Sequence, residues 1–158
     1  MRARDVMSKG VMSVASDASV HEAAALLVKT RVSAMPVVDS AGTMVGLVSE
    51  ADLVRAFDSG SDGGLLRGFT GDGDAAGPTL ALKNRKVTDV MTRDVAFVDA
   101  DATLADIARL MLQRGVKRLP VVDEGAVVGI VSRTNLLEAA VSGDRAAWVG
   151  PRSGGWRR

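Results

Sequence analysis

Residues 33–52 read SAMPVVDSAGTMVGLVSEAD and contain the most informative pattern of secondary structure in the chain. Two apolar runs, 35–38 and 44–48, flank a short turn that contains Gly42, which predicts a β-hairpin. A helix is expected to follow, from about Ala51 to Phe57. Further along, residues 117–135 read KRLPVVDEGAVVGIVSRTN and repeat the pattern with a turn that is one residue shorter. The hairpin and its helix are therefore predicted to occur twice in the chain.

The repeat extends to the N-terminal side of each hairpin. Asp5-Val6-Met7 returns as Asp89-Val90-Met91, and 20 of 49 aligned positions are identical (5–40 with 89–124, 44–56 with 127–139). The offset between the copies is 84 before the turn and 83 after it. Two copies of one unit, rather than the three or more that a solenoid needs, indicate a pair of small domains.

A strand and a helix are expected before each hairpin. In the first copy the strand is predicted at residues 11–14, and Ser19 with Glu22 forms a capping box that opens the helix. Thr103 and Asp106 hold the same places in the second copy. Each copy thus reads strand, helix, strand, strand, helix, which is an α/β (α+β) fold.

The repeat also divides the chain into segments. The first copy spans 1–57 and the second 86–141, with a Gly/Asp-rich linker at 58–85 and a Gly/Arg-rich tail at 142–158. About 50 residues cannot bury a large core alone. The two copies are therefore expected to pack face to face through their sheets, with pseudo-twofold symmetry.

Composition excludes several classes of protein. There is no cysteine, and the formal net charge is +1, so neither disulfides nor a general attraction to nucleic acid is expected. No apolar run approaches the roughly 18 residues of a membrane span, and the N-terminus has no apolar run typical of a secretory signal. The single histidine, His21, has no partner for acid–base chemistry or a metal. A cytoplasmic protein without catalytic function is predicted.

The strand-to-helix turns carry the candidate site. Ser49 and Ser132 precede a predicted helix, where a hydroxyl and unpaired backbone N–H groups attract phosphate. Three residues after Ser49, the Asp52 carboxylate has two oxygens that can accept hydrogen bonds from the hydroxyls of a ribose. Gly46 and Gly129 would let a ligand approach the backbone. A purely structural alternative is that Ser49 caps the helix and Asp52 interacts with its dipole.

These segments carry a family resemblance. Asp5-Val6-Met7-Ser8, residues 33–39 and residues 46–53, with their second-copy partners, resemble the CBS domain, named for cystathionine β-synthase. The pair resembles a Bateman module over about 5–57 and 86–141, and in particular the actinobacterial CBS pairs that precede a BON domain. Members of the family bind AMP, ADP, ATP, S-adenosylmethionine or no ligand.

The resemblance implies a sensor that binds an adenosine nucleotide in the cleft between the repeats and requires no other cofactor. It assigns phosphate contact to Ser49 and Ser132 and ribose contact to Asp52. Asn135 stands where that Asp is expected, and an amide has one acceptor oxygen instead of two, so a weaker ribose contact is expected there. The other expected ligand-binding residues are the two hairpin prolines and the basic residues near the second: Pro36, Pro120, Lys117, Arg118 and Arg133.

The resemblance also implies assembly. Two chains are expected to pair through the helices of each repeat, by way of six small or apolar side chains: Ala23, Ala24, Leu27, Ala108, Met111 and Leu112. The alternative function is a ligand-free dimerisation or interaction module that acts on a regulated protein. A nucleic-acid binder that uses the arginines of the tail is disfavoured, because the chain lacks a patch of interleaved aromatic and basic residues.

Overall fold

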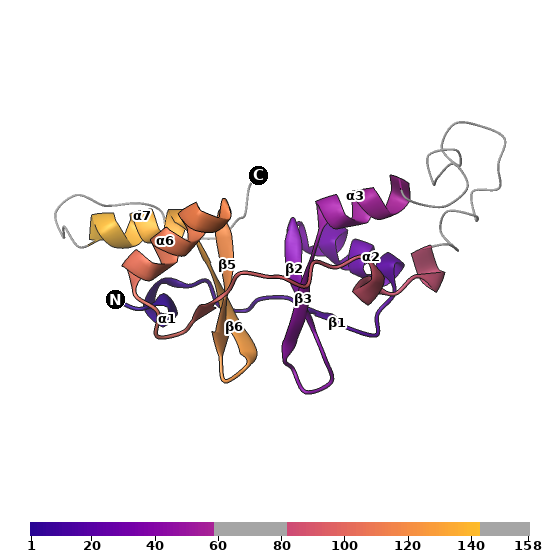
Figure 1. Ribbon diagram of the computed structural model, residues 1–158, viewed down its shortest axis with the longest axis horizontal. Helices are drawn as coiled ribbons and strands as arrows, with labels where there is room; N and C mark the ends of the chain where they lie inside the picture. Colours follow the sequence, from indigo (N-terminus) through magenta and orange to yellow (C-terminus); the bar gives the residue numbers. More distant parts are fainter. Residues whose placement is uncertain (59–81, 143–158) are drawn as a thin grey trace. The chain divides into compact units, whose positions relative to one another are not determined.

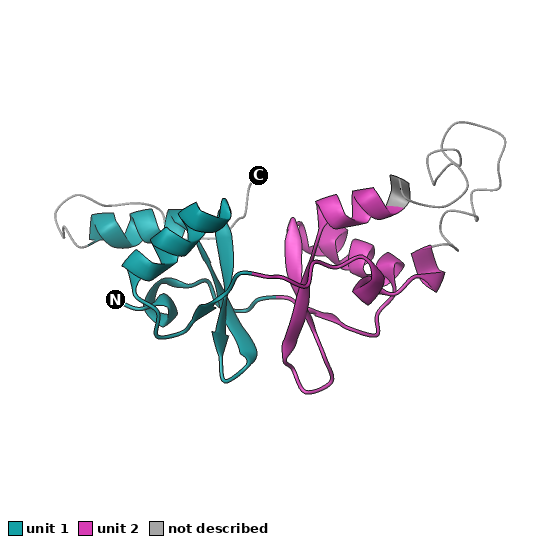
Figure 2. Cartoon of the chain, viewed as in Figure 1, with its two compact units in different colours: residues 1–11, 96–158 teal, residues 12–95 magenta. Residues whose placement is uncertain are grey.

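The computed structural model describes residues 1–58 and 82–142, which belong to two compact units (Figures 1 and 2). Unit 2 is formed by residues 12–95 and unit 1 by residues 1–11 and 96–158. The described N-terminal segment thus belongs with the second copy, and residues 87–95 belong with the first. The compact units therefore divide the chain differently from the sequence repeats at 1–57 and 86–141. The expected linker and tail lie mostly outside the described residues.

Unit 2 contains a three-stranded sheet in the order β1-β2-β3, with β1 parallel and β3 antiparallel to β2. Its elements are β1 (Val14–Ala15), α2 (Val20–Thr30), β2 (Ala34–Val38), β3 (Met44–Ser49), α3 (Glu50–Asp58) and the single 3₁₀ turn η1 (Val87–Asp89). The hairpin and its helix are confirmed. The strand expected at 11–14 is shorter and begins later than predicted, because only Val14 and Ala15 pair with residues of β2.

Unit 1 repeats the arrangement with a sheet in the order β4-β5-β6. Its elements are α1 (Ala3–Val6), β4 (Val98–Asp99), α6 (Leu104–Arg114), β5 (Arg118–Asp123), β6 (Ala126–Ser132) and α7 (Arg133–Ser142). In each unit two helices lie together on one side of the sheet (Figure 1). The predicted strand–helix–strand–strand–helix order is therefore confirmed in both copies.

Hydrogen bonds explain why the N-terminal segment lies with unit 1. The N–H of Ala3 donates to the carbonyl of Ala102 at 2.9 Å, and Ser8 exchanges two backbone hydrogen bonds with Ile130 on β6. Ala3 is fully buried, and Arg4 forms an ion pair with Asp101. In unit 2, Thr92 exchanges the corresponding backbone bonds with Leu47 on β3. A segment distant in sequence thus pairs with the outer edge of each hairpin.

Side-chain caps begin the first long helix of each unit. Ser19 and Glu22 form the predicted reciprocal capping box, with bonds of 2.7 and 3.1 Å. Thr103 accepts from the N–H of Asp106, and its hydroxyl donates to the Asp106 carboxylate at 2.6 Å. This hydroxyl contact is the main reason that the pKa of Asp106 lies below its usual value.

The apolar helix faces point into the cores. Ala23, Leu27 and Met111 are at most 3% exposed, so the expectation that they form a contact between chains is wrong. The exposed apolar residues are one position further along each helix: Val28 on α2 is 79% exposed and Leu112 on α6 is 75% exposed. A 3.6-residue pattern marks the inward face of a helix, and the residues it marks are already covered by their own sheet.

Candidate functional site

Ser49 and Asp52 meet where β3 ends and α3 begins. The Ser49 hydroxyl oxygen accepts from the N–H of Asp52 at 3.2 Å. In return, Asp52 Oδ2 accepts from the Ser49 N–H at 2.9 Å and from the Ser49 hydroxyl at 2.8 Å. The two residues therefore form a reciprocal N-terminal helix cap, as the structural alternative predicted.

The second oxygen of the same carboxylate has different partners. The Thr92 hydroxyl donates to Asp52 Oδ1 at 3.3 Å, and the Arg55 guanidinium forms an ion pair with it. Asp52 is buried, with 5% exposure, whereas the Arg55 side chain is 71% exposed. A carboxylate has about four acceptor positions, so the protein itself supplies a donor for each of them. The donors on Oδ1 differ from those on Oδ2, because both come from side chains outside the cap: Thr92 through a long bond, and Arg55 through an ion pair from a largely exposed side chain.

Ser132 and Asn135 form the same cap in unit 1. Asn135 Oδ1 accepts from the N–H and the hydroxyl of Ser132, each at 2.9 Å, and the N–H of Asn135 donates to the Ser132 hydroxyl at 3.2 Å. The amide therefore satisfies the helix terminus as well as a carboxylate does. The two sites differ in the remaining group, because Asp52 has an acceptor oxygen where Asn135 has an NH₂ donor.

The two strand glycines accommodate methionine side chains. A Cβ added to Gly46 would lie 2.5 Å from Met91 Sδ, and one added to Gly129 would lie 2.3 Å from Met7 Sδ. The space that the missing side chains leave is therefore filled by the protein. The expectation that these glycines admit a ligand to the backbone is wrong in this structure.

The remaining expected site residues lie as follows. Pro36 and Pro120 are buried within β2 and β5. Lys117 and Arg118 are exposed, and Arg118 lies opposite Ser132 in the strand register of unit 1. Arg133 donates to two carbonyls of its own unit, from its N–H to Lys117 at 3.1 Å and from its guanidinium to Val116 at 3.2 Å. The structure thus brings the basic residues together with Ser132.

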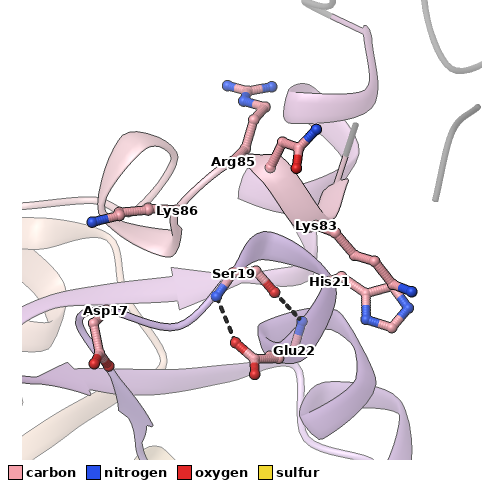
Figure 3. Close-up of a pocket in the computed structure, with 8 residues that line it drawn as sticks. Asp17, Ser19, His21, Glu22, Lys83, Arg85 and Lys86 are labelled. Atoms are coloured by element: carbon pink, nitrogen blue, oxygen red, sulfur yellow. Dashed lines mark hydrogen bonds between the residues drawn. The ribbon is translucent and has the colours of Figure 1, made fainter. Parts of the chain in front are cut away.

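Hollows on the described surface of unit 2 include two that bear on the site. One, of about 620 Å³, is open and polar, and its lining includes Ser19 and Glu22, whose polar groups are already hydrogen-bonded to each other in the helix cap (Figure 3). The other, of about 150 Å³, adjoins the candidate site and is lined by Asp52, Arg55, Ala56, Arg85, Asp89 and Val90. Three residues around Asp52 were not expected from the sequence: Arg55, Arg85 and Thr92. Only Arg55 had a signal, because a residue three positions after Asp52 lies on the same helix face.

Among residues 1–58 and 82–142, no group of three or more His, Asp or Glu side chains is arranged to hold a metal ion. No helix in the same part of the chain combines the length and apolar character needed to cross a membrane.

Comparison with known proteins places the repeat in a family. The family model of the CBS domain matches residues 3–59 and again residues 87–142. The chain belongs to the CBS-domain family. Its units are accordingly the two halves of a CBS pair, each with a three-stranded sheet and covering helices.

Several relatives resemble most of this CBS pair. The uncharacterized protein MJ1426 of Methanocaldococcus jannaschii is 35% identical over 155 residues, which cover 89% of this chain and 92% of that protein. The chloroplastic CBS domain-containing protein CBSX1 of Arabidopsis thaliana is 36% identical over 142 residues, covering 82% of this chain. The chain spans 60% of CBSX1 and only 41% of another relative, MJ1225.

Two solved structures of similar CBS pairs contain ligands. The structure of CBSX2 in complex with AMP has a TM-score of 0.68 and 32% identity, covering 91% of this chain and 98% of that one. The CBS pair of protein MJ0100, in complex with 5′-methylthioadenosine and S-adenosyl-L-methionine, has a TM-score of 0.64 and 26% identity, with the same coverage. Similar CBS pairs therefore bind adenosine compounds.

Proposed function

We propose that this CBS pair is a non-catalytic regulatory module that binds AMP, ADP or ATP, with Asp52 of unit 2 as the ribose-binding residue. The observation that carries the proposal is that the two oxygens of the Asp52 carboxylate have different partners. Its Oδ2 accepts both hydrogen bonds of the helix cap, while the donors on Oδ1, Thr92 and Arg55, lie outside the cap and can be replaced by a ligand without opening it. The AMP complex of the similar protein CBSX2 supports the ligand class.

Ribose hydroxyls are suitable replacements for those donors. The Thr92 hydroxyl and a ribose hydroxyl are chemically alike, and a ribose hydroxyl can donate to Oδ1 in place of Thr92, whose bond is long. The cap holds Oδ2, so both ribose hydroxyls must donate to Oδ1 of Asp52. This differs from the expectation that each hydroxyl would donate to a separate oxygen of the carboxylate. Asn135 presents an NH₂ group at that place, so we favour the Asp52 site over the Asn135 site.

The phosphate end of the ligand is assigned by expectation alone. Ser49 is proposed as a phosphate contact in unit 2, and Ser132 with Lys117, Arg118 and Arg133 as the corresponding groups in unit 1. That Lys117 and Arg118 contact a nucleotide bound at Asp52 stays a prediction. The cytoplasmic location and the similarity to CBS pairs that precede BON domains also stay predictions. No further cofactor is required by the proposal.

Thermal melting with AMP, ADP and ATP tests the proposal. A ligand at 100 times its dissociation constant adds about 2.7 kcal/mol to the free energy of unfolding, so a clear rise in melting temperature is expected. Asp52→Asn should reduce the affinity by about tenfold or more, because a charge-assisted hydrogen bond contributes roughly 1.5–3 kcal/mol.

Asp52→Asn is also a controlled change. Asn135 makes the same three contacts to Ser132 that Asp52 makes to Ser49, so an asparagine at position 52 should preserve the cap. The loss of the Thr92 and Arg55 contacts should lower the melting temperature without ligand, so the response to nucleotide is measured as the shift relative to each protein's own ligand-free melt. The proposal is rejected if none of the three nucleotides shifts the wild-type melt. It is also rejected if the Asp52→Asn protein responds to them as the wild type does.

A second candidate function, an interaction module, is favoured by a repeated apolar surface. Val28 and Leu112 occupy equivalent places in the two copies and are highly exposed. Val54 on α3 and Leu137 on α7 form a second equivalent pair, 61% and 67% exposed. Contiguous exposed apolar patches mark protein interfaces, and the repetition of these exposed residues at equivalent helix positions of both copies favours such a contact. We propose that two chains pair through these residues, in place of the buried ones first expected.

Val28→Glu with Leu112→Glu is expected to convert this dimer to a monomer. Burying a carboxylate in an apolar contact without a partner is strongly unfavourable. Light scattering at micromolar concentration would measure the mass, and Met12→Glu, an exposed apolar residue outside the helices, is the control. A wild-type protein that is already monomeric would refute the pairing, and a dimer that persists in the double variant would refute this surface.

A further inference from the structure

Opposite charges stand beside the exposed apolar residues of α3 and α7. On α3, Val54 is 61% exposed, and the exposed Glu50 lies four residues before it, on the same face of the helix. On α7, Leu137 is 67% exposed, and the exposed Arg133 lies four residues before it. Glu50 and Arg133 occupy equivalent positions in the two copies. An acidic residue of one unit is therefore replaced by a basic residue in the other, beside an equivalent apolar side chain.

The positions that follow Val54 and Leu137 show a second reversal of charge. Arg55 comes directly after Val54, and Glu138 comes directly after Leu137. The Arg55 side chain is 71% exposed, and Glu138 is also exposed. In order along the chain, α3 thus presents Glu, an apolar residue and Arg, where α7 presents Arg, an apolar residue and Glu. The two helices are electrostatically complementary when they lie side by side in the same direction, with Val54 beside Leu137.

The acidic side chains of this pattern have no ion-pair partner in the described part of the chain. Neither the Glu50 nor the Glu138 carboxylate lies within ion-pair distance of a basic group there. The Arg133 guanidinium donates to the carbonyl of Val116 at 3.2 Å, and Arg55 has the ion pair described above. A guanidinium has five N–H donors, so each arginine can contact a further carboxylate without leaving its present partner.

Pairing of like helices lacks this complementarity. If two copies of α3 lay side by side in the same direction, Glu50 would face Glu50 and Arg55 would face Arg55. Two copies of α7 would oppose like charges in the same way. Like charges across an interface are unfavourable and select against the wrong partner. With two helices in opposite directions the charged positions fall out of register, because they lie four residues before and one residue after the apolar side chain.

We propose that two chains pair with α3 of one chain beside α7 of the other, so that Glu50 meets Arg133 and Arg55 meets Glu138. The partner that fits the α3 face is thus the opposite unit of a second copy. The inference rests on the second candidate function, the pairing of two chains, and deepens it by naming which faces meet. It does not need the phosphate contact expected of Arg133. In a symmetric dimer the contact occurs twice, because each chain contributes one α3 and one α7.

Charge reversals in the full chain, measured by sedimentation velocity, test this assignment of faces. Glu50→Arg or Arg133→Glu alone should weaken the dimer about tenfold or more, because each substitution places like charges together at both occurrences of the contact. Glu50→Arg with Arg133→Glu should return the dissociation constant to near the wild-type value, since the ion pair is restored with its charges exchanged. Lys9→Glu reverses an exposed charge outside the helices and is the control, which should leave the dimer unchanged.

The double variant also separates the interface from folding. A loss of pairing caused by a folding defect would persist in it, whereas a lost ion pair is restored. Unchanged dimers in both single variants, or a double variant as weak as the single ones, would overturn the assignment of α3 to α7 while the pairing of chains stands. If the wild type is monomeric, the pairing itself fails and this inference fails with it.

Discussion

Gly129→Ala is expected to destabilise unit 1 by about 2–3 kcal/mol, near the upper end of the usual cost of overpacking a core. The added Cβ would lie 2.3 Å from Met7 Sδ, 2.7 Å from Met7 Cγ and 3.0 Å from Met7 Cβ. Met7 cannot simply rotate its tip away, because the contact reaches back to its Cβ. The methyl group should therefore displace the N-terminal segment from β6, and urea denaturation would measure the loss.

A double variant separates this mechanism from a general effect on the strand. In Gly129→Ala with Met7→Ala, the three closest contacts are reduced to one, so the two substitutions should cost less together than the sum of their separate costs. Gly46→Ala should be relieved less completely by Met91→Ala, because the backbone carbonyl of Thr92 also lies 2.9 Å from the added Cβ. Strictly additive losses at Gly129 and Met7 would contradict the steric explanation.

Asn135→Asp is expected to add a second nucleotide site to the chain. The Ser132 cap should persist, because Asp52 makes the same contacts to Ser49 in unit 2. The substitution replaces the NH₂ group of Asn135 with a carboxylate oxygen that can accept from a ribose. Calorimetry should show the stoichiometry rising from one to two AMP molecules per chain.

Glu138 provides a refinement of that experiment. It occupies the position of Arg55 in the second copy, so its negative charge would oppose a phosphate beside the new carboxylate. Asn135→Asp with Glu138→Arg should therefore bind AMP more tightly at the second site than Asn135→Asp alone. A stoichiometry of one in both variants would show that the residue at this position does not decide whether the site is occupied.

Local features of the fold were predictable from the sequence. The hairpin at 34–49, the helix that follows it, and the Ser19–Glu22 and Thr103–Asp106 caps all depend on residues within a few positions of one another. The repeat itself then predicted that the second half of the chain would adopt the same order of elements. For the same reason the cap formed by Ser49 and Asp52 was predictable, as the structural alternative to a ligand site.

Contacts between distant segments were decided only by the tertiary structure. The sequence pattern marked Ala23 and Leu27 as one apolar face, but their burial depends on the sheet that covers them. Likewise Gly46 was marked as an open position, and Met91, 45 residues away, fills it. The sequence by itself determined two copies of one unit and the residue types at each strand-to-helix turn. Only the tertiary structure placed residues 1–11 with the second copy and Thr92 beside Leu47, because the edge of a sheet leaves backbone groups that a distant segment can pair with. That pairing in turn brings the Thr92 hydroxyl to Asp52.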